Sequence, residues 1–254
     1  MAKDKMIKNI EGARKSLAKT LSFANNLVEK IIAKVDQVAP SQENRNRVIS
    51  AIVLIPLAVY AIYFSQSLFF FITIILTILM TAEWLNLIKT AKDQDKWQLI
   101  GLAYIAIPIF CVIKLRMISS DILLWMFAVI WATDIFAFFS GKTFGGPKLA
   151  PEISPNKTWS GLAGGVVASM IIGFLSSFMF SGGVFFFVFL SALLAVIEQA
   201  GDLLESKFKR LFGVKDSGTI IPGHGGVLDR LDGMMFTAPA VLFFITIFAD
   251  KFGY

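Results

Sequence analysis

The feature that most constrains this chain is a pair of long stretches without any charged residue. Residues 48–82 and residues 158–197 contain no Asp, Glu, Lys or Arg. Short polar breaks at 65–67 and 181–183 divide each stretch into two segments. Each segment approaches the roughly 17–25 residues that a helix needs to cross a hydrocarbon layer about 30 Å thick. The stretches therefore predict four membrane spans.

Three further segments have the same character: residues 97–113, residues 122–141 with a single acid at Asp134, and residues 233–249. With 56% apolar residues the chain also exceeds the roughly 45–50% that is usual in soluble proteins. We therefore expect an all-α, polytopic transmembrane bundle of about seven spans, with residues 47–254 as the transmembrane catalytic domain.

The distribution of positive charge predicts the orientation of these spans. The net charge is +6, and 21 of the 24 Lys and Arg residues fall on one side of the predicted membrane if the N-terminus is cytoplasmic. Cytoplasmic segments are enriched in Lys and Arg, so we expect the N-terminus inside the cell. The same distribution explains the basic charge without nucleic-acid binding. A single Cys and a single His exclude a disulfide framework and a Cys/His zinc cluster.

Residues 1–46 are predicted to form a cytoplasmic amphipathic helical segment. Apolar residues recur there at intervals of three and four, and no hydrophobic region typical of a signal peptide is present. Two interpretations stay open for this helix. It could lie on the lipid surface, or it could form a coiled-coil seam between two copies of the chain.

Most of the candidate catalytic and binding residues lie in two segments on the predicted cytoplasmic side. These segments are residues 134–161 and residues 198–233. In the second, Asp229 and Asp232 stand three positions apart at the start of the last span, so a helix places both on one face. Asp202 is expected at the cytoplasmic end of the sixth span. Carboxylates of this kind suit Mg²⁺, although helix capping by Asp229 is the ordinary alternative.

The same segment carries a basic cluster and a glycine-rich turn. The cluster comprises Lys207, Lys209, Arg210 and Lys215, and the turn is Gly223-His224-Gly225-Gly226. Cations and exposed backbone amides together favour a bound polyphosphate. For Lys207, anchoring to anionic lipid is an equally simple explanation. We expect His224 to bind or position a phosphate.

The first segment combines Lys142, Lys148 and Lys157 with several glycines and prolines. We expect a rigid cationic loop at the membrane face, and residues 154–158 offer a helix N-terminus that could bind phosphate. Asp134 lies within a predicted span, and an acid in that position is a candidate functional residue. A salt bridge to a lysine of its own loop is the alternative.

The second segment resembles the signature of the phosphatidate cytidylyltransferase (CDP-diacylglycerol synthase) family. The matching residues run Ser206-Lys207-Phe208-Lys209-Arg210, then Lys215-Asp216, then Pro222 to Asp232. The run Gly201–Ser206 and the residues Asp134, Gly141-Lys142 and Ser154–Thr158 also look like that family. One departure is Ser160, which stands where the family usually has Glu.

The resemblance implies transfer of a cytidylyl group from CTP to phosphatidate, with pyrophosphate as the second product and Mg²⁺ as cofactor. It also implies a second cation such as K⁺ and a homodimer. The size and simple topology of the chain suit a bacterial inner membrane, and the charge distribution predicts an active site that faces the cytoplasm. Asp202, Asp229 and Asp232 would hold metal, and these acids with Lys209 would be catalytic. The residues implied to bind CTP or the lipid phosphate are Lys142, Lys157, Ser206, Lys207, Arg210, Lys215, His224, Gly225, Gly226 and Arg230.

Two other functions fit parts of the sequence. A membrane kinase that uses CTP to phosphorylate a polyprenol would release CDP instead of pyrophosphate. A transporter would explain Asp134, but it predicts charged residues along the middle of several spans, and here the charges gather at span ends.

Overall fold

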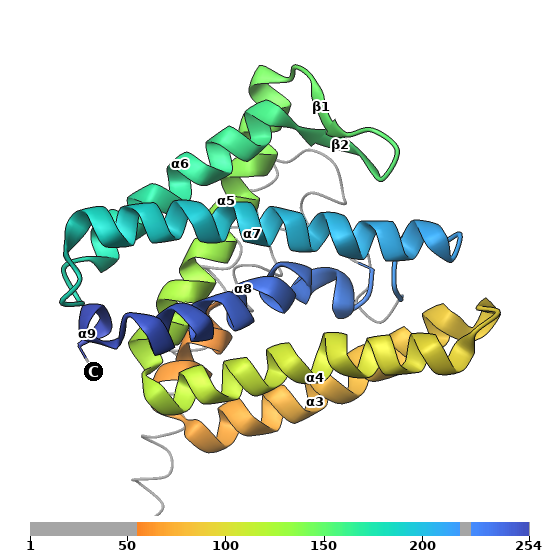
Figure 1. The fold of residues 1–254 in the computed structure, drawn as a ribbon, viewed down its shortest axis with the longest axis horizontal. Coiled ribbons are helices and arrows are strands. Elements are labelled where there is room, and N and C mark those ends of the chain that lie inside the picture. The colour runs from red at the N-terminus through yellow and green to blue at the C-terminus, as the bar shows by residue number, and fades with distance from the viewer. Residues whose placement is uncertain (1–54, 219–224, 254) are drawn as a thin grey trace, which may run out of the picture. The chain divides into compact units, whose positions relative to one another are not determined.

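The computed structural model describes residues 55–218 and 225–253, and residues 57–254 form one compact unit. The predicted amphipathic segment 1–46 lies outside the described residues. Figure 1 shows a bundle of long helices with one small hairpin at its edge. The prediction of an all-α, polytopic membrane bundle is confirmed. The chain is an integral membrane protein.

Among the described residues, six helices are long and apolar enough to cross a membrane. They are α3 (Gln66–Leu87), which a short 3-10 turn extends to Thr90, α4 (Gln94–Ile118), α5 (Ser120–Phe144), α6 (Trp159–Ser176), α7 (Gly183–Leu211) and α8 (Leu228–Ile247). A shorter apolar helix covers Ile55–Phe64, and a last turn, α9, covers Ala249–Phe252. The predicted span that contains the helix Ile55–Phe64 begins at residue 48, outside the described residues. This N-terminal span, which would bring the total to seven, therefore stays a prediction.

Both predicted breaks fall at the start of a helix. Ser65 is the N-cap of α3, where its hydroxyl accepts a hydrogen bond from the amide of Leu68. The second predicted break, 181–183, lies where α7 begins at Gly183, after the turn 177–182 that joins α6 to α7. Each charge-free stretch is therefore divided into two helices near the short polar break that predicted the division.

Helices α5 and α6 pack closely because α6 presents glycines to α5. A methyl group added at Gly161 would come within 2.8 Å of the Ala137 carbonyl oxygen, and one at Gly165 within 3.0 Å of Thr133. Small residues of this kind allow helix backbones to approach in membrane proteins. Helix α7 packs against both α6 and α8, and α4 packs against α8.

The predicted loop 134–161 is largely ordered as secondary structure. Helix α5 continues to Phe144, and an antiparallel hairpin of β1 (Lys148–Ala150) and β2 (Ser154–Thr158) follows. Helix α6 then begins at Trp159, where the Thr158 hydroxyl accepts a hydrogen bond from the Gly161 amide. The expected helix N-terminus is present, and one of its backbone amides already donates a hydrogen bond to Thr158.

The predicted loop 198–233 is also shorter than expected. Helix α7 continues nine residues beyond Asp202, to Leu211, and α8 begins at Leu228. Asp202, which was expected at the cytoplasmic end of the sixth span, therefore lies inside α7, and the helix runs on past it. No Gly or Pro interrupts the chain between Asp202 and Leu211, and Glu205 pairs with Lys209 one turn later, which favours helix.

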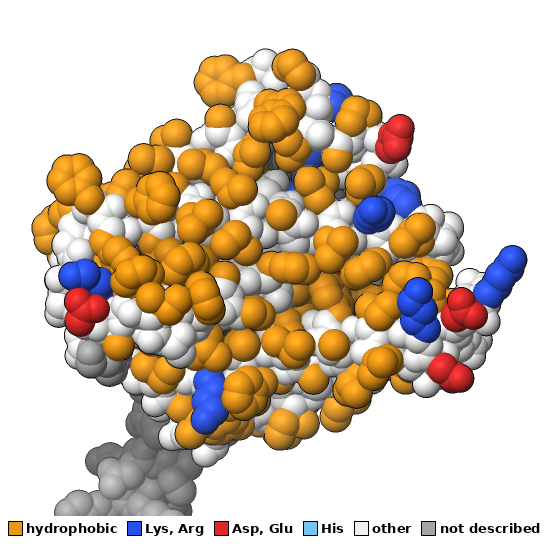
Figure 2. Space-filling view, viewed as in Figure 1, with side chains coloured by type: hydrophobic (Ala, Val, Ile, Leu, Met, Phe, Trp, Pro, Cys, Tyr) orange, Lys and Arg blue, Asp and Glu red, His pale blue; other side chains and the backbone are white. Residues whose placement is uncertain are grey.

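The outer surface fits a lipid environment. In Figure 2 hydrophobic side chains cover the middle of the visible face, and the charged side chains gather toward its two ends. Exposed residues include Phe71, Phe110, Phe139 and Phe185. Large exposed apolar areas are unusual in soluble monomers and are expected where lipid is the solvent.

Candidate active site

The hairpin contributes one lysine to the last turns of α7. Lys157 on β2 donates a hydrogen bond to Gln199 Oε1 over 2.9 Å and forms an ion pair with Asp202. Ser206 lies one turn further along α7, with its hydroxyl 3.4 Å from Asp202 Oδ1. Lys157 and Asp202, predicted independently from two segments, are therefore direct neighbours.

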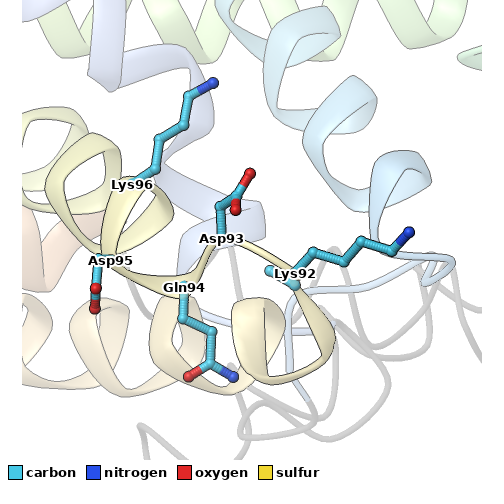
Figure 3. Close-up of a pocket in the computed structure, with 6 residues that line it drawn as sticks. Lys92, Asp93, Gln94, Asp95 and Lys96 are labelled. Carbon is cyan, nitrogen blue, oxygen red and sulfur yellow. The ribbon is translucent and has the colours of Figure 1, made fainter.

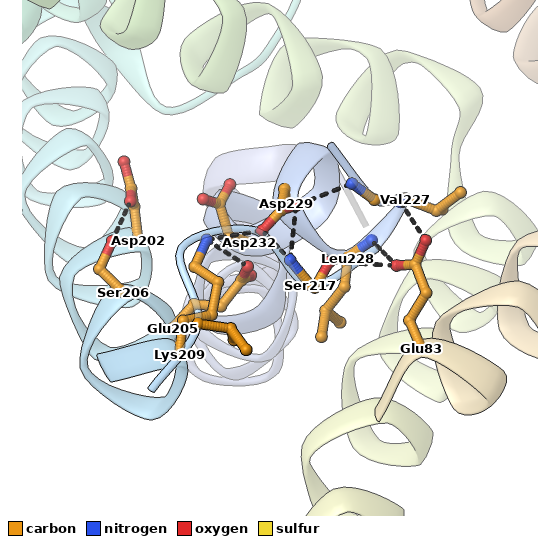
Figure 4. A network of polar contacts seen from close by, with 12 residues as sticks. Glu83, Asp202, Glu205, Ser206, Lys209, Ser217, Val227, Leu228, Asp229 and Asp232 are labelled. Atoms are coloured by element: carbon orange, nitrogen blue, oxygen red, sulfur yellow. Dashed lines mark hydrogen bonds and ion pairs between the residues drawn. The ribbon is translucent and has the colours of Figure 1, made fainter. Parts of the chain in front are cut away.

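Lys209 links α7 to the start of α8. Its Nζ lies 3.0 Å from Glu205 Oε1 and 2.6 Å from Asp229 Oδ1 (Figure 4). Glu205 is fully buried and Lys209 retains only 8% of its accessible surface. A lysine in this position neutralises two carboxylates that would otherwise be costly to bury. The predicted catalytic residues Lys209 and Asp229 are thus in contact.

Gly225 and Gly226 of the glycine-rich turn lie against Asp229. The carboxylate accepts hydrogen bonds from the Ser217 amide at 2.9 Å and the Gly226 amide at 2.8 Å. Gly225 has φ +81°, and a methyl group there would come within 2.6 Å of Asp229 Oδ2. The anion that Gly226 contacts is therefore a side chain of the protein itself. His224 lies outside the described residues.

Asp232 belongs to a cluster of carboxyl groups. Its electrostatic neighbours are Asp202, Glu205, Asp134 and Glu198. Asp134 on α5 has Lys157 and Arg230 as its cationic neighbours, so it interacts with a lysine of its own loop as well as with the cluster. The predicted metal ligands Asp202 and Asp232 thus influence each other electrostatically, and Asp229 lies on the Lys209 side.

The cluster fits a cation by the chemistry of its donors. Carboxyl groups outnumber basic groups, and Glu198 Oε1 and Glu205 Oε2 are buried with no hydrogen-bond partner among the described residues. Hard oxygen donors in surplus suit Mg²⁺. No three Asp, Glu, His or Cys side chains in the described ranges are arranged to enclose a metal ion. The three-carboxylate ligand set stays a prediction.

Most of the remaining predicted residues are exposed. Lys142, Lys207, Lys215 and Arg230 are exposed, and the Lys142 ammonium lies 5.7 Å from the centre of the Phe138 ring. Arg210 donates hydrogen bonds to the carbonyl oxygens of Ile153 and Val214. It therefore joins the hairpin to the end of α7.

Ser160, the departure from the family pattern, has a local partner. Its hydroxyl donates a hydrogen bond to the Gly145 carbonyl and lies 3.0 Å from Thr158 Oγ1. Gly145 has φ +61° and ends α5. Ser160 therefore ties the two ends of the hairpin connection together.

Four residues of this network were missed from the sequence: Glu83, Glu198, Gln199 and Glu205. Glu83 and Glu198 each stand directly after a charge-free stretch, so their position resembles an ordinary interfacial charge. An acid adjoining a span is the signal that could have found them. Gln199 carries no charge, and its hydrogen bonds to Lys157 and Glu198 appear only in the fold.

A hollow of about 550 Å³ lies at the turn between α3 and α4 (Figure 3). It is lined by the run Ala91 to Lys96. None of the predicted site residues belongs to this lining. The hollow is therefore distinct from the carboxylate and lysine network.

Comparison with known proteins identifies the family. Residues 97–248, more than half of the chain, match the sequence model of the Cytidylyltransferase family. The phosphatidate cytidylyltransferase of Rickettsia felis is 45% identical over 212 residues, which cover 79% of this chain and 91% of that protein. The enzyme of the same name from Rickettsia bellii is 44% identical, with 78% and 89% covered. That of Brucella abortus is 42% identical over 180 residues, with 68% and 63% covered. The chain therefore belongs to the cytidylyltransferase family and, within it, to the phosphatidate cytidylyltransferases.

Proposed function

We propose that this enzyme makes CDP-diacylglycerol and pyrophosphate from CTP and phosphatidate. The observation that carries the proposal is the pairing of Lys157 with Asp202 and of Lys209 with Asp229 beside buried, unpartnered carboxylate oxygens. Such a centre suits a metal-bound polyphosphate. The names of the relatives supply the lipid substrate.

In the proposed reaction a phosphate oxygen of phosphatidate attacks the α-phosphorus of CTP. A new P–O bond forms, the bond between the α-phosphorus and the bridging oxygen breaks, and that oxygen leaves with pyrophosphate. The protein provides no nucleophile, so its contribution is to position two anions and to neutralise their charge. Lys157 and Lys209, which pair with Asp202 and Asp229, would serve that role, and the exposed Lys142, Lys207 and Lys215 would add positive charge for the phosphates.

A divalent cation such as Mg²⁺ would be held by Asp202 and Asp232, with Asp229 alongside. When bound, it would offset the negative charge of the triphosphate. The surplus of carboxyl groups also leaves room for a second cation such as K⁺. Asp134 would support the cluster from α5 through its interactions with Lys157 and Arg230.

The proposed setting is a bacterial inner membrane, with seven spans and a cytoplasmic N-terminus. The positive-inside distribution then places the active site at the cytoplasmic face, where CTP is available. The lipid phosphate would reach the centre from the side, because the site lies at the ends of membrane helices. A homodimer is part of the same proposal.

Product analysis tests the function. Purified protein in mixed micelles is supplied with CTP, phosphatidate and Mg²⁺, and the water-soluble product is identified. Release of pyrophosphate together with CDP-lipid supports the proposal. Release of CDP would identify a CTP-dependent kinase. If phosphatidate yielded neither pyrophosphate nor CDP, the assignment of phosphatidate as the substrate would be refuted.

A further inference from the structure

Glu83 near the end of α3 binds both ends of the loop that precedes Asp229. Its Oε1 accepts a hydrogen bond from the Val227 amide at 2.8 Å, and its Oε2 accepts one from the Leu228 amide, also at 2.8 Å. The Ser217 hydroxyl lies 3.2 Å from the same Oε2. Glu83 therefore contacts the loop at positions 217 and 227 and the first residue of α8 (Figure 4).

The backbone is shaped to admit this carboxylate. Only 3% of the accessible surface of Glu83 remains exposed. A methyl group at Gly226 would come within 2.5 Å of its Oε2, and one at Gly218 within 2.7 Å of its Oε1. Two glycines therefore permit the loop to close around a side chain that is more than 130 residues away in sequence.

Ser217 connects Glu83 to Asp229. Its hydroxyl contacts Glu83, and its amide donates to Asp229, which in turn pairs with Lys209. The Gly226 amide, beside the Glu83 contacts, donates to the same aspartate. Removing the carboxylate of Glu83 would leave the amides of Val227 and Leu228 without acceptors and release both segments that hold Asp229.

We propose that Glu83 is a positioning residue for the reaction, acting through Ser217 and the turn at 225–228 on Asp229 and Lys209. It precedes residues 97–248, the part that matches the family model. The inference rests on the proposed function. It goes beyond it by placing a structural determinant of turnover on α3, a helix that contributes none of the predicted substrate or metal contacts.

The test compares Glu83→Gln with Thr73→Val in the full-length protein. Thr73 is a buried polar residue of the same helix, and its hydroxyl bonds only to the carbonyl of Phe69 in the described structure. The glutamine keeps the size of the side chain but presents an NH2 group to at least one amide donor. We expect kcat to fall about tenfold and the half-saturating Mg²⁺ concentration to rise about threefold in Glu83→Gln. The KM for phosphatidate should change by less than about twofold, and Thr73→Val should match the wild type in all three.

Hydrogen exchange of the 225–230 segment gives a measurement that needs no activity. Exchange should become faster in Glu83→Gln and stay unchanged in Thr73→Val. Unchanged exchange with unchanged kinetics would overturn the positioning role, as would a uniform loss of activity that leaves the Mg²⁺ dependence intact. An inactive wild type in which Glu83→Gln still loosens the segment would instead refute the proposed function, while the control of the 225–230 segment by Glu83 would stand.

Ser217→Ala provides a second variant if Glu83→Gln does not fold. It removes only the hydroxyl that contacts Glu83, and the Ser217 amide stays available to Asp229. We expect a loss of about twofold to fivefold in kcat, with the same rise in Mg²⁺ requirement. A wild-type Mg²⁺ dependence in this variant would contradict the connection through Ser217.

Discussion

The two ends of the helix bundle are closed in different ways. At the end that contains the α6–α7 turn, aromatic rings pack on one another, with Trp125, Phe180 and Phe252 all against Phe187. At the other end, Glu83, Glu198, Glu205 and Lys209 are buried in a polar network.

Burying carboxyl groups is unfavourable unless they are paired and hydrogen-bonded. The aromatic end demonstrates that this chain can close a bundle without them. Among the described residues, the polar end even leaves oxygens of Glu198 and Glu205 without partners. The difference indicates that the polar end is organised for chemistry and the aromatic end for stability.

The largest effect is expected from neutralising an acid of the polar end. Asp232→Asn should lower turnover by about a thousandfold, because it removes charge from the proposed cation site. Asp250→Asn at the aromatic end is the control, since Asp250 is exposed and pairs only with the neighbouring Lys251 in the described structure. Turnover in mixed micelles is the measurement. Equal effects of the two substitutions would abolish the distinction between the ends.

Lys157→Met should lower turnover by about a hundredfold, because a preorganised cation at a phosphate site is lost. Asp202 would also lose its ion pair and Gln199 its donor. Lys148→Met in the same hairpin is the matched control, because Lys148 is exposed. If Lys148→Met were the more damaging change, the hairpin would serve the site through Lys148 instead.

Ser160→Ala should reduce turnover only about twofold to fivefold, since it removes one hydrogen bond to the Gly145 carbonyl at the edge of the site. Ser169→Ala is the control within α6, where the hydroxyl bonds to the carbonyl of Val166. Initial rates with saturating CTP compare the two. A loss near that of Lys157→Met would mean that Ser160 acts within the centre itself.

Phe187→Ala should leave the turnover of folded protein within about twofold of the wild type. It should lower the free energy of unfolding by about 3 kcal/mol, because it opens a cavity in the aromatic cluster. Thermal unfolding in detergent, measured together with turnover, separates the two quantities. A large fall in turnover without loss of stability would show that the aromatic end also shapes the reaction.

The architecture could be predicted from the sequence because lipid imposes a simple rule. Segments without charge, or with the single acid Asp134, locate α3 to α8, and the short polar breaks at 65–67 and 181–183 coincide with the starts of α3 and α7. The extent of α7 beyond Asp202 could not be predicted, because a polar amphipathic helix end resembles a loop when only charge is considered.

Contacts between residues of the two predicted segments were partly predictable, since Lys157, Asp202, Lys209 and Asp229 were all candidate site residues and form ion pairs in the fold. The partners that lie still farther apart in sequence could not be predicted. Glu83 meets the α8 start across 145 positions, and no local pattern encodes such a contact. The Gly226 amide donates a hydrogen bond to Asp229, and the binding of a phosphate by the glycine-rich turn stays a prediction.

Transfer of a labelled phosphate from CTP tests the central claim most directly. With CTP labelled at the α-phosphorus, the wild-type protein should place the label in the lipid product, and a γ-phosphorus label should leave with pyrophosphate. Asp229→Asn should insert and fold but transfer the α-label about a thousandfold more slowly, because the contacts to Lys209, Ser217 and Gly226 weaken. Near wild-type transfer of the α-label by this variant would contradict the account.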